Sequence, residues 1–107
     1  MKEEKELNRF KAKIFKALAD PIRLEILQLL REGEKCVCEI VLQLEIAQPL
    51  VSRHLKILKD CGLVKDRKYG NRRIYSVTDP RIFNVIDGIT PDFKESLSKI
   101  IIEQMIY

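Results

Sequence analysis

The chain has 107 residues, which is enough for one domain with a modest core and too few for two. Hydrophobic residues make up 46% and charged residues 34%, a mixture that excludes a disordered chain, and no apolar run approaches the ~20 residues of a membrane span. Residues 48–81 carry nine Lys and Arg against three Asp and Glu, whereas residues 1–47 are balanced. Such a basic segment attracts a polyanion, although a solvated basic face is the plainer interpretation.

The three cysteines and the charged N-terminus favour a cytoplasmic protein. The first ten residues, MKEEKELNRF, contain no apolar segment of the kind that directs secretion. An odd number of cysteines without such a signal is typical of free thiols in a reducing compartment. We therefore expect Cys36, Cys38 and Cys61 to be unpaired, and we expect no association with a membrane.

Two helices are predicted in the first third of the chain. Apolar residues recur at helical spacing through residues 4–19 and indicate an amphipathic helix. Asp20 can cap a second helix, and Pro21 suits its first position because a missing N–H costs nothing there. This helix extends to about residue 32, and Gly33 fits the position just beyond its end.

A helix-turn-helix pattern and a hairpin follow. A short helix is predicted over about residues 38–45 and a longer one over residues 48–61. A tight turn joins them, so the helix-turn-helix covers about residues 38–61. The pattern then changes to alternation over about residues 63–77, around a turn at Gly70 that can adopt positive φ. The basic residues of the chain are concentrated in the second helix and this hairpin.

Two more helices complete the predicted order. Asp79-Pro80 and Thr90-Pro91 each combine a cap with a proline, and the last helix covers about residues 91–106. The order predicts a mainly α protein with a two-stranded β-wing, the winged helix-turn-helix, as a single domain over residues 1–107.

The helix at residues 48–61 has one apolar and one polar side. Val51, Leu55 and Leu58 fall on the side predicted to be buried, while Arg53 on the other side can present a guanidinium to guanine. A solvated surface helix is the plainer interpretation of this pattern alone, but five cations on the adjacent hairpin favour binding to double-stranded DNA. The predicted DNA contacts are Gln48, Pro49, Ser52, Arg53 and Lys56 at the helix and Lys65, Arg67, Lys68, Arg72 and Arg73 on the hairpin.

Four segments together resemble the ArsR family of bacterial and archaeal transcriptional repressors: FKALADPIRLEILQLL, CVCEI, VSRHLKILKDCGLV and RKYGNRRIYSV, over roughly residues 10–87. The resemblance implies a homodimeric winged helix-turn-helix repressor that an inducer, often a metal or metalloid ion, releases from its operator. It also implies a recognition helix at residues 48–61, with Gln48, Ser52, Arg53 and His54 facing or flanking the DNA. The chain departs from the family at Ala47, where Ser is common, so a cap hydroxyl is lost.

The CVCEI segment resembles the family's arsenic-sensing motif, which implies that Cys36 and Cys38 bind As(III), Sb(III) or Cd(II) as an inducer. Thiolates are suitable ligands for such soft ions. Residues two apart lie ~200° apart around a regular helix, so chelation requires Cys36 to lie outside the helix or the first turn to distort. The family's third cysteine is replaced by Val41, and we expect Cys61 to be a small core residue.

Three interpretations of Cys36 and Cys38 stay open. They can sense an ion with an exogenous or partner-chain third ligand, act as a thiol-redox switch, or have no sensing role in a regulator with another inducer or none. No cofactor is required. An enzyme is not expected, because the chain has one histidine and lacks a Ser–His–acid pattern and a Gly-rich phosphate loop. A winged-helix protein-interaction module is a further alternative, but it predicts an apolar or acidic recognition face.

The first and last helices carry more apolar surface than a domain of this size can cover. We therefore expect a homodimer formed through residues of about 4–19 and 91–106, as the resemblance also implies. The alternative is that both stripes fold onto the domain's own core. The predicted interface residues are Leu7, Phe10, Ile14, Phe93, Leu97, Ile100, Ile101 and Met105.

Overall fold

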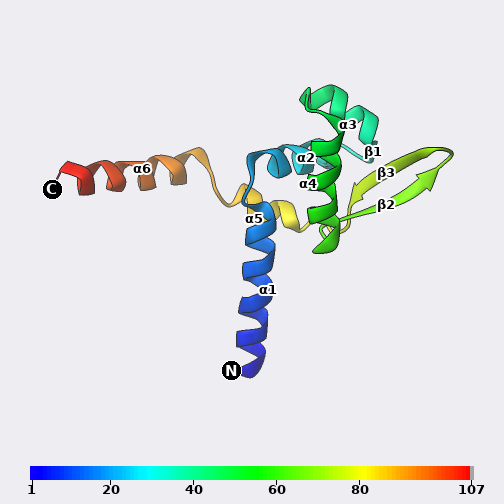
Figure 1. Cartoon of the computed structure of the whole chain (residues 1–107). Helices are drawn as coiled ribbons and strands as arrows, with labels where there is room; N and C mark the ends of the chain where they lie inside the picture. The colour runs from blue at the N-terminus through cyan, green and yellow to red at the C-terminus, as the bar shows by residue number, and fades with distance from the viewer. Residues whose placement is uncertain (107) are drawn as a thin grey trace.

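The computed structural model describes residues 1–106, and its order of helices and strands confirms the mainly α winged helix-turn-helix prediction (Figure 1). Its helices are α1 (Lys2–Leu18), α2 (Pro21–Arg31), α3 (Val37–Leu44), α4 (Gln48–Asp60), α5 (Ile82–Asp87) and α6 (Pro91–Ile106). Its strands are β1 (Lys35–Cys36), β2 (Val64–Tyr69) and β3 (Arg72–Val77).

The predicted two-stranded wing is confirmed as β2 and β3, and a third antiparallel strand, β1, extends the sheet in the order β1-β3-β2. The wing itself, β2 and β3, turns at Gly70, whose φ of 63° is the positive value expected there. The added strand β1 pairs Cys36 with Ile74 of β3. Two residues are too few to show an alternating pattern, and their partner lies almost forty positions away. The sequence therefore contains no local signal for this strand.

The core lies where α2, α3 and α4 meet the base of the sheet. Ile26, Ile40 and Leu55 are fully buried there, one from each helix. Val51 and Leu58 are fully buried beside Leu55, which confirms the predicted apolar side of α4. Because this stripe is inside the protein, the polar side of α4 must face outward.

The start of α2 has the predicted cap. A carboxylate oxygen of Asp20 accepts hydrogen bonds from the backbone N–H groups of Ile22 and Arg23, at 2.7 and 3.3 Å, and Pro21 takes the first helical position. In contrast, Ala47 caps α4 without a side-chain hydrogen bond, because alanine has no side-chain acceptor. The first turn of α4 therefore lacks the side-chain cap that α2 has.

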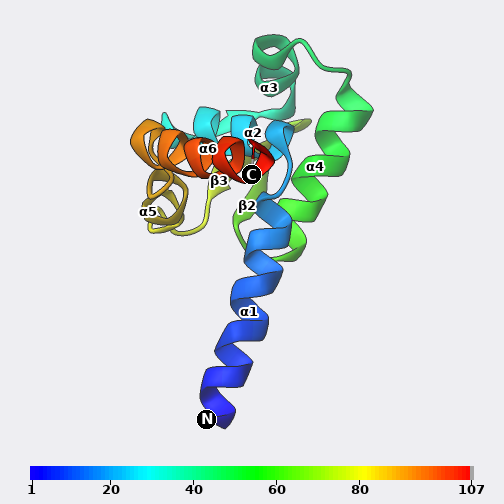
Figure 2. The ribbon, with the colours of Figure 1, turned by 90° about the vertical axis from the view of Figure 1, so that its left-hand side faces the viewer.

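Helices α1 and α6 project from this body in different directions (Figures 1 and 2). The molecule extends 59 Å along its longest axis. Helix α6 has no buried residue, and α1 has buried residues only at its last turn, Ala17 and Leu18. Within residues 1–106, no helix is long and apolar enough to cross a membrane.

Candidate functional site

The outward side of α4 carries the residues that we predicted to contact DNA. Ser52, Arg53 and Lys56 are exposed on it, and Gln48 and Pro49 are exposed at its first turn. A helix with exposed polar side chains and a buried apolar stripe can enter a major groove and present an amide and a guanidinium to base edges. Lys56 donates to Asp60 one turn later, at 3.0 Å, so part of its charge is balanced.

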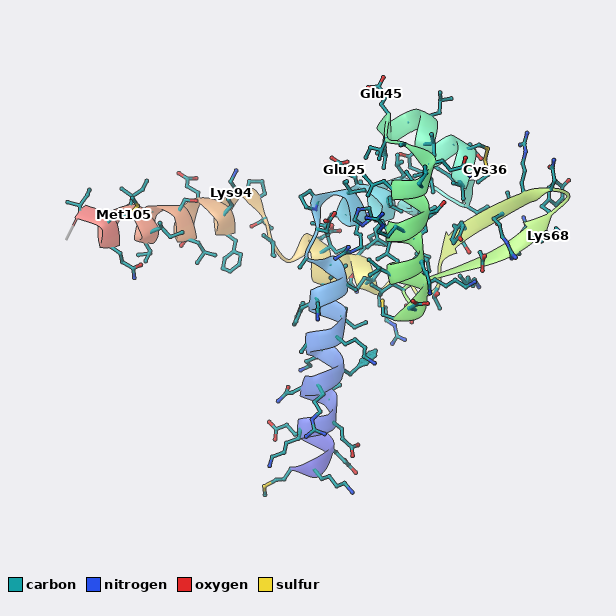
Figure 3. The ribbon with its side chains drawn as sticks, in the orientation of Figure 1. Glu25, Cys36, Glu45, Lys68, Lys94 and Met105 are labelled. Carbon is teal, nitrogen blue, oxygen red and sulfur yellow. A yellow bond between two sulfur atoms is a disulfide. The ribbon has the colours of Figure 1, made fainter. Side chains whose placement is uncertain are left out.

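The wing presents a second set of cations beside this helix (Figure 3). Arg67 pairs with Glu34 at 2.7 Å, which raises the pKa of its guanidinium, and Arg73 lies 3.4 Å from Asp66. Among residues 1–106, no carboxylate lies within 4.0 Å of the charged nitrogens of the other three predicted contacts. These are Lys65, Lys68 and Arg72, and all three are exposed.

His54 corrects the predicted set of DNA contacts, because its side chain is buried, with 7% of the residue exposed. Its Nδ1 accepts a hydrogen bond at 3.1 Å from Arg23, which has only donors to offer. Arg23 also donates from Nε to the carbonyl oxygen of Ala17 at 2.6 Å. His54 therefore ties α4 to the junction of α1 and α2. The partner, 31 positions earlier, gives no local signal in the sequence.

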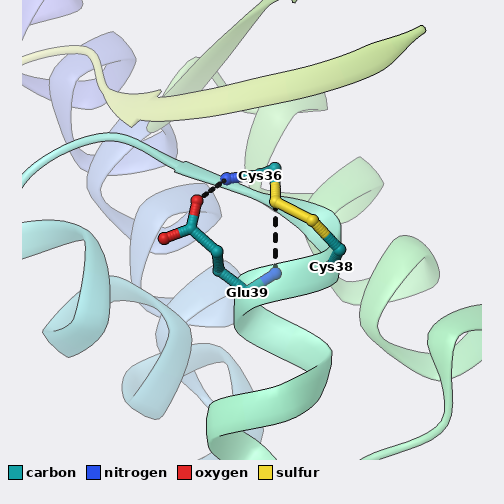
Figure 4. The surroundings of a disulfide bond; sticks show 3 residues. All are labelled: Cys36, Cys38 and Glu39. Atoms are coloured by element: carbon teal, nitrogen blue, oxygen red, sulfur yellow. Dashed lines mark hydrogen bonds between the residues drawn. A yellow bond between two sulfur atoms is a disulfide. The ribbon is translucent and has the colours of Figure 1, made fainter.

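The cysteine pair also differs from the expectation of free thiols, because a disulfide joins Cys36 and Cys38 (Figure 4). Cys36 is the N-cap of α3 and has the extended backbone of β1, with φ −76° and ψ 161°. It thus lies outside the helix, which meets the geometric condition that two sulfurs at this spacing require. Cys61 stays a free thiol; its Sγ donates to the carbonyl oxygen of Leu58 at 3.2 Å, and the residue packs against the core as predicted.

A capping box holds the first turn of α3 around this pair. The Sγ of Cys36 accepts from the backbone N–H of Glu39 at 3.2 Å, and the Glu39 carboxylate accepts from the N–H of Cys36 at 3.1 Å (Figure 4). We did not predict a role for Glu39, although its position three residues after the cap is the spacing of this motif. Cys36 is almost fully buried, whereas Cys38 is exposed.

The sulfur pair and the predicted DNA contacts line a common cavity. Cys36 and Cys38 face it together with Gln48, the first residue of α4, and with Arg72 and Arg73 near the turn of the wing. Its volume is about 230 Å³. A change in the state of the sulfurs therefore occurs next to both parts of the basic surface, the outward side of α4 and the wing.

Comparison with known proteins agrees with this geometry. The sequence profile of "Bacterial regulatory protein, arsR family" matches residues 20–66. An uncharacterized HTH-type transcriptional regulator of Methanocaldococcus jannaschii is 50% identical over 76 residues, covering 70% of this chain and 85% of that protein. The chain belongs to the arsR family. Members of this family are DNA-binding transcriptional regulators, so this chain is a winged-helix transcriptional regulator and not an enzyme.

Two further relatives of this arsR-family chain are informative. A probable mercury resistance operon repressor of Streptomyces lividans is 47% identical over 75 residues, covering 70% of this chain and 60% of that protein. This chain therefore spans less than two thirds of that repressor. The homodimeric winged helix-turn-helix DNA-binding domain of a possible ArsR-family regulator from Mycobacterium bovis superposes with a TM-score of 0.73. It is 26% identical and covers 99% of this chain and 90% of that one.

The described part of this arsR-family chain brings no complete set of metal ligands together. Within residues 1–106, no three His, Cys, Asp or Glu side chains are close enough together to hold an ion. Val41 occupies the position of the expected third cysteine, and Cys61 is engaged with Leu58. Two sulfurs alone are available, so an ion bound at Cys36 and Cys38 must take its remaining ligands from solution or from another chain.

Proposed function

We propose that this protein is a dimeric repressor that binds operator DNA with α4 and the wing and is released by a signal at Cys36 and Cys38. The observation that carries the proposal is the single basic surface formed by the outward side of α4 and the cations of the wing. Arg53 and Gln48 are its readers of bases, because both can make paired hydrogen bonds to a base edge. Lys65, Lys68 and Arg72 hold the phosphates, because no ion pair within residues 1–106 balances them.

Dimerisation is the second part of the proposal. Phe93, Leu97 and Ile101 of α6 are about half exposed, so the chain leaves a long apolar helix uncovered. An apolar cavity of about 580 Å³ between α1, α2 and α5, lined by Phe15, Leu24 and other residues, is available to receive a second copy. Of the predicted interface residues, Ile14 instead packs partly against the chain's own core. A symmetric dimer places two recognition helices ~34–36 Å apart, one turn of DNA.

The inducer acts at the cysteine pair, and a thiophilic ion such as As(III), Sb(III) or Cd(II) is the first candidate. Reduced Cys36 and Cys38 offer two thiolates on one side of the first turn of α3, since Cys36 is extended. The ion binds in the cavity that Arg72 and Arg73 share with the sulfurs. Ligands from solution, such as hydroxide, draw these arginines away from DNA phosphates and so weaken binding.

Thiol oxidation is the second candidate, and the disulfide favours it. A peroxide or a small disulfide takes two electrons from the thiol pair, two protons leave, and one S–S bond forms; two equivalents of a thiol reverse the step. The two candidates exclude each other on one molecule, because the disulfide uses both sulfurs that an ion needs.

A DNA-binding titration tests the proposal. A duplex is selected from a random pool by the reduced protein, and its affinity is measured by fluorescence anisotropy against salt. A dimer that neutralises roughly eight phosphates gives a slope of log K against log[salt] near −7. A flat salt response, or no selection of any duplex, contradicts the DNA surface.

The sensing part needs its own variant. Cys36→Ser with Cys38→Ser keeps DNA binding but loses release by arsenite, cadmium or peroxide; Cys61→Ser is the matched control and keeps release. Release of the double variant by all three agents contradicts sensing at this pair. Arsenite and cadmium acting only on the reduced protein support the ion, and peroxide alone supports oxidation.

A further inference from the structure

One carboxylate lies inside the basic surface, at the joint between the recognition helix and the wing. The side chain of Asp66, on β2, is 7% exposed. One of its oxygens lies 2.9 Å from Nζ of Lys59 on α4, and the other lies 3.4 Å from a guanidinium nitrogen of Arg73 on β3. A buried carboxylate is stable only when it is paired, and here its two partners come from two different parts of the DNA-binding surface.

The protonation state of Asp66 is consistent with this pairing. The hydrogen bond from Lys59 lowers the pKa of Asp66 more than burial raises it, and the charges of Lys59 and Arg73 lower it further. The same hydrogen bond raises the pKa of Lys59. Asp66 is therefore a carboxylate and Lys59 an ammonium at neutral pH, and the pair is a charged one.

The joint between α4 and the wing is a short turn, and the base of the wing is anchored beside it by the buried side chains of Leu63 and Val64. Helix α4 ends at Asp60, and Gly62 turns the chain with φ 86° into β2. Beside the turn, a hollow of about 340 Å³ is lined by residues of α4 and of the wing, among them Lys59, Asp66 and Arg73. Within it, Asp66 pairs with Lys59 of α4 and with Arg73 of the neighbouring strand β3.

We infer that Asp66 is a positioning residue that fixes the angle between α4 and the wing, so that both parts reach one duplex at the same time. It touches no DNA itself. The inference rests on the proposed function of α4 and the wing as the DNA-binding surface, and it assigns a role that the charge of Asp66 alone does not predict. An acidic group inside a basic surface repels phosphates, so its presence needs another reason.

Positioning and plain charge predict opposite signs for Asp66→Asn. Removing one negative charge from a basic surface strengthens binding to every duplex and steepens the salt dependence. Releasing Lys59 and Arg73 from a shared partner instead loosens the wing against α4. That change weakens binding to the selected operator, where both parts must fit, and spares binding to random duplexes, where any basic surface suffices.

The test compares Asp66→Asn with Asp60→Asn in fluorescence anisotropy on the selected duplex and on a random duplex of equal length. Asp60 is a matched control because it lines the same hollow and pairs with Lys56, yet its side chain is 63% exposed. We expect Asp66→Asn to lower operator affinity about tenfold, the cost of a typical mismatched base pair, with random binding unchanged or tighter. We expect Asp60→Asn to tighten both equally. Equal tightening of both duplexes by Asp66→Asn overturns the inference.

A double-mutant cycle shows whether Asp66 acts through its partner on α4. Lys59→Met combined with Asp66→Asn should lose no more operator selectivity than the stronger single variant, because one tie is broken in each case. Additive losses overturn the inference. Urea unfolding monitors the fold of each variant.

If Asp66→Asn does not fold, Asp66→Glu takes its place, since it keeps the charge and moves the carboxylate by one methylene. We expect Asp66→Glu to reduce the ratio of operator to random affinity, and an unchanged ratio overturns the inference. A wild-type protein that selects no duplex overturns the proposed DNA surface itself, which is a different outcome from equal behaviour of the Asp66 and Asp60 variants.

Discussion

Helices α4 and α6 are both apolar on part of their surface, but the chain treats them differently. In α4 the apolar residues Val51, Leu55 and Leu58 are completely buried, whereas α6 has no buried residue and Leu97 is 50% exposed. Burial on one side fixes which side of α4 faces outward, so this single chain sets the orientation of its recognition helix. The apolar surface of α6 is instead exposed in the single chain, which is why we propose that a second copy covers it.

The largest expected effect is on the buried side of α4. Leu55→Ala removes a fully buried side chain and leaves a cavity, so we expect the free energy of unfolding to fall by about 2–5 kcal/mol, a large part of a small domain's stability. Urea unfolding measures the loss. Ile57→Ala, two residues away on the same helix and 37% exposed, is the control and should cost clearly less. Equal losses of unfolding free energy in the two variants would mean that the buried side chains of α4 do not set its orientation.

A charge on α6 tests the other side of the comparison. Leu97→Asp should weaken dimerisation at least about tenfold, because the apolar interface proposed for α6 offers no partner for the new carboxylate. The core formed by α2, α3 and α4 should keep its stability. Sedimentation velocity over a range of concentrations measures the change. Ser98→Asp adds the same charge to the next residue, about 100° around the helix, and should dissociate the dimer less. A Leu97→Asp protein that dimerises like the wild type would remove α6 from the interface.

We expect the outward side of α4 and the wing to divide the contacts with DNA. Arg53→Ala should lose about 1–3 kcal/mol of binding to the selected duplex and relax the preference at specific base pairs. Arg72→Ala should weaken all duplexes alike and reduce the salt slope by about one. Competition binding with single-base variants of the duplex separates these patterns. The reverse result would exchange the roles of reader and phosphate contact.

The smallest expected effect concerns the turn before α5, which links the body to α6. Arg81 donates hydrogen bonds to the Asp79 carboxylate and lowers the pKa of Asp79 from 3.8 to about 2. A lowered pKa stabilises the fold above about pH 4, and this contribution is lost as the pH falls toward 2. Asp79→Asn should therefore flatten the loss of thermal stability between pH 4 and 2. Circular dichroism melts of the wild type and the variant at several pH values measure the difference, and identical pH profiles would contradict it.

Local signals predicted most of the fold. The Asp20–Pro21 pair marked the start of α2, and the apolar spacing of α4 gave its buried stripe, because caps and helical faces depend on residues within one or two turns. The glycine at position 70 marked the turn of the wing in the same way. The predicted order of elements needed no long-range contact.

Two features that the sequence did not reveal depend on contacts between distant residues. Strand β1 exists through its pairing with Ile74, and His54 is buried through Arg23. The disulfide, in contrast, joins cysteines that are only two residues apart. Their sulfurs meet because Cys36 has the extended backbone of β1, which removes the divergence expected on a regular helix.

The sequence by itself determined the winged helix-turn-helix order and its basic segment, because helical periodicity, caps and the concentration of cations in residues 48–81 depend on neighbouring residues. Only the tertiary structure decided which of the polar residues lie together. It buried His54 against Arg23, brought the Cys36–Cys38 pair beside Arg72, and paired Asp66 of the wing with Lys59 of α4. Each of these contacts joins different helices or strands, and packing of the core rather than local preference brings such elements together.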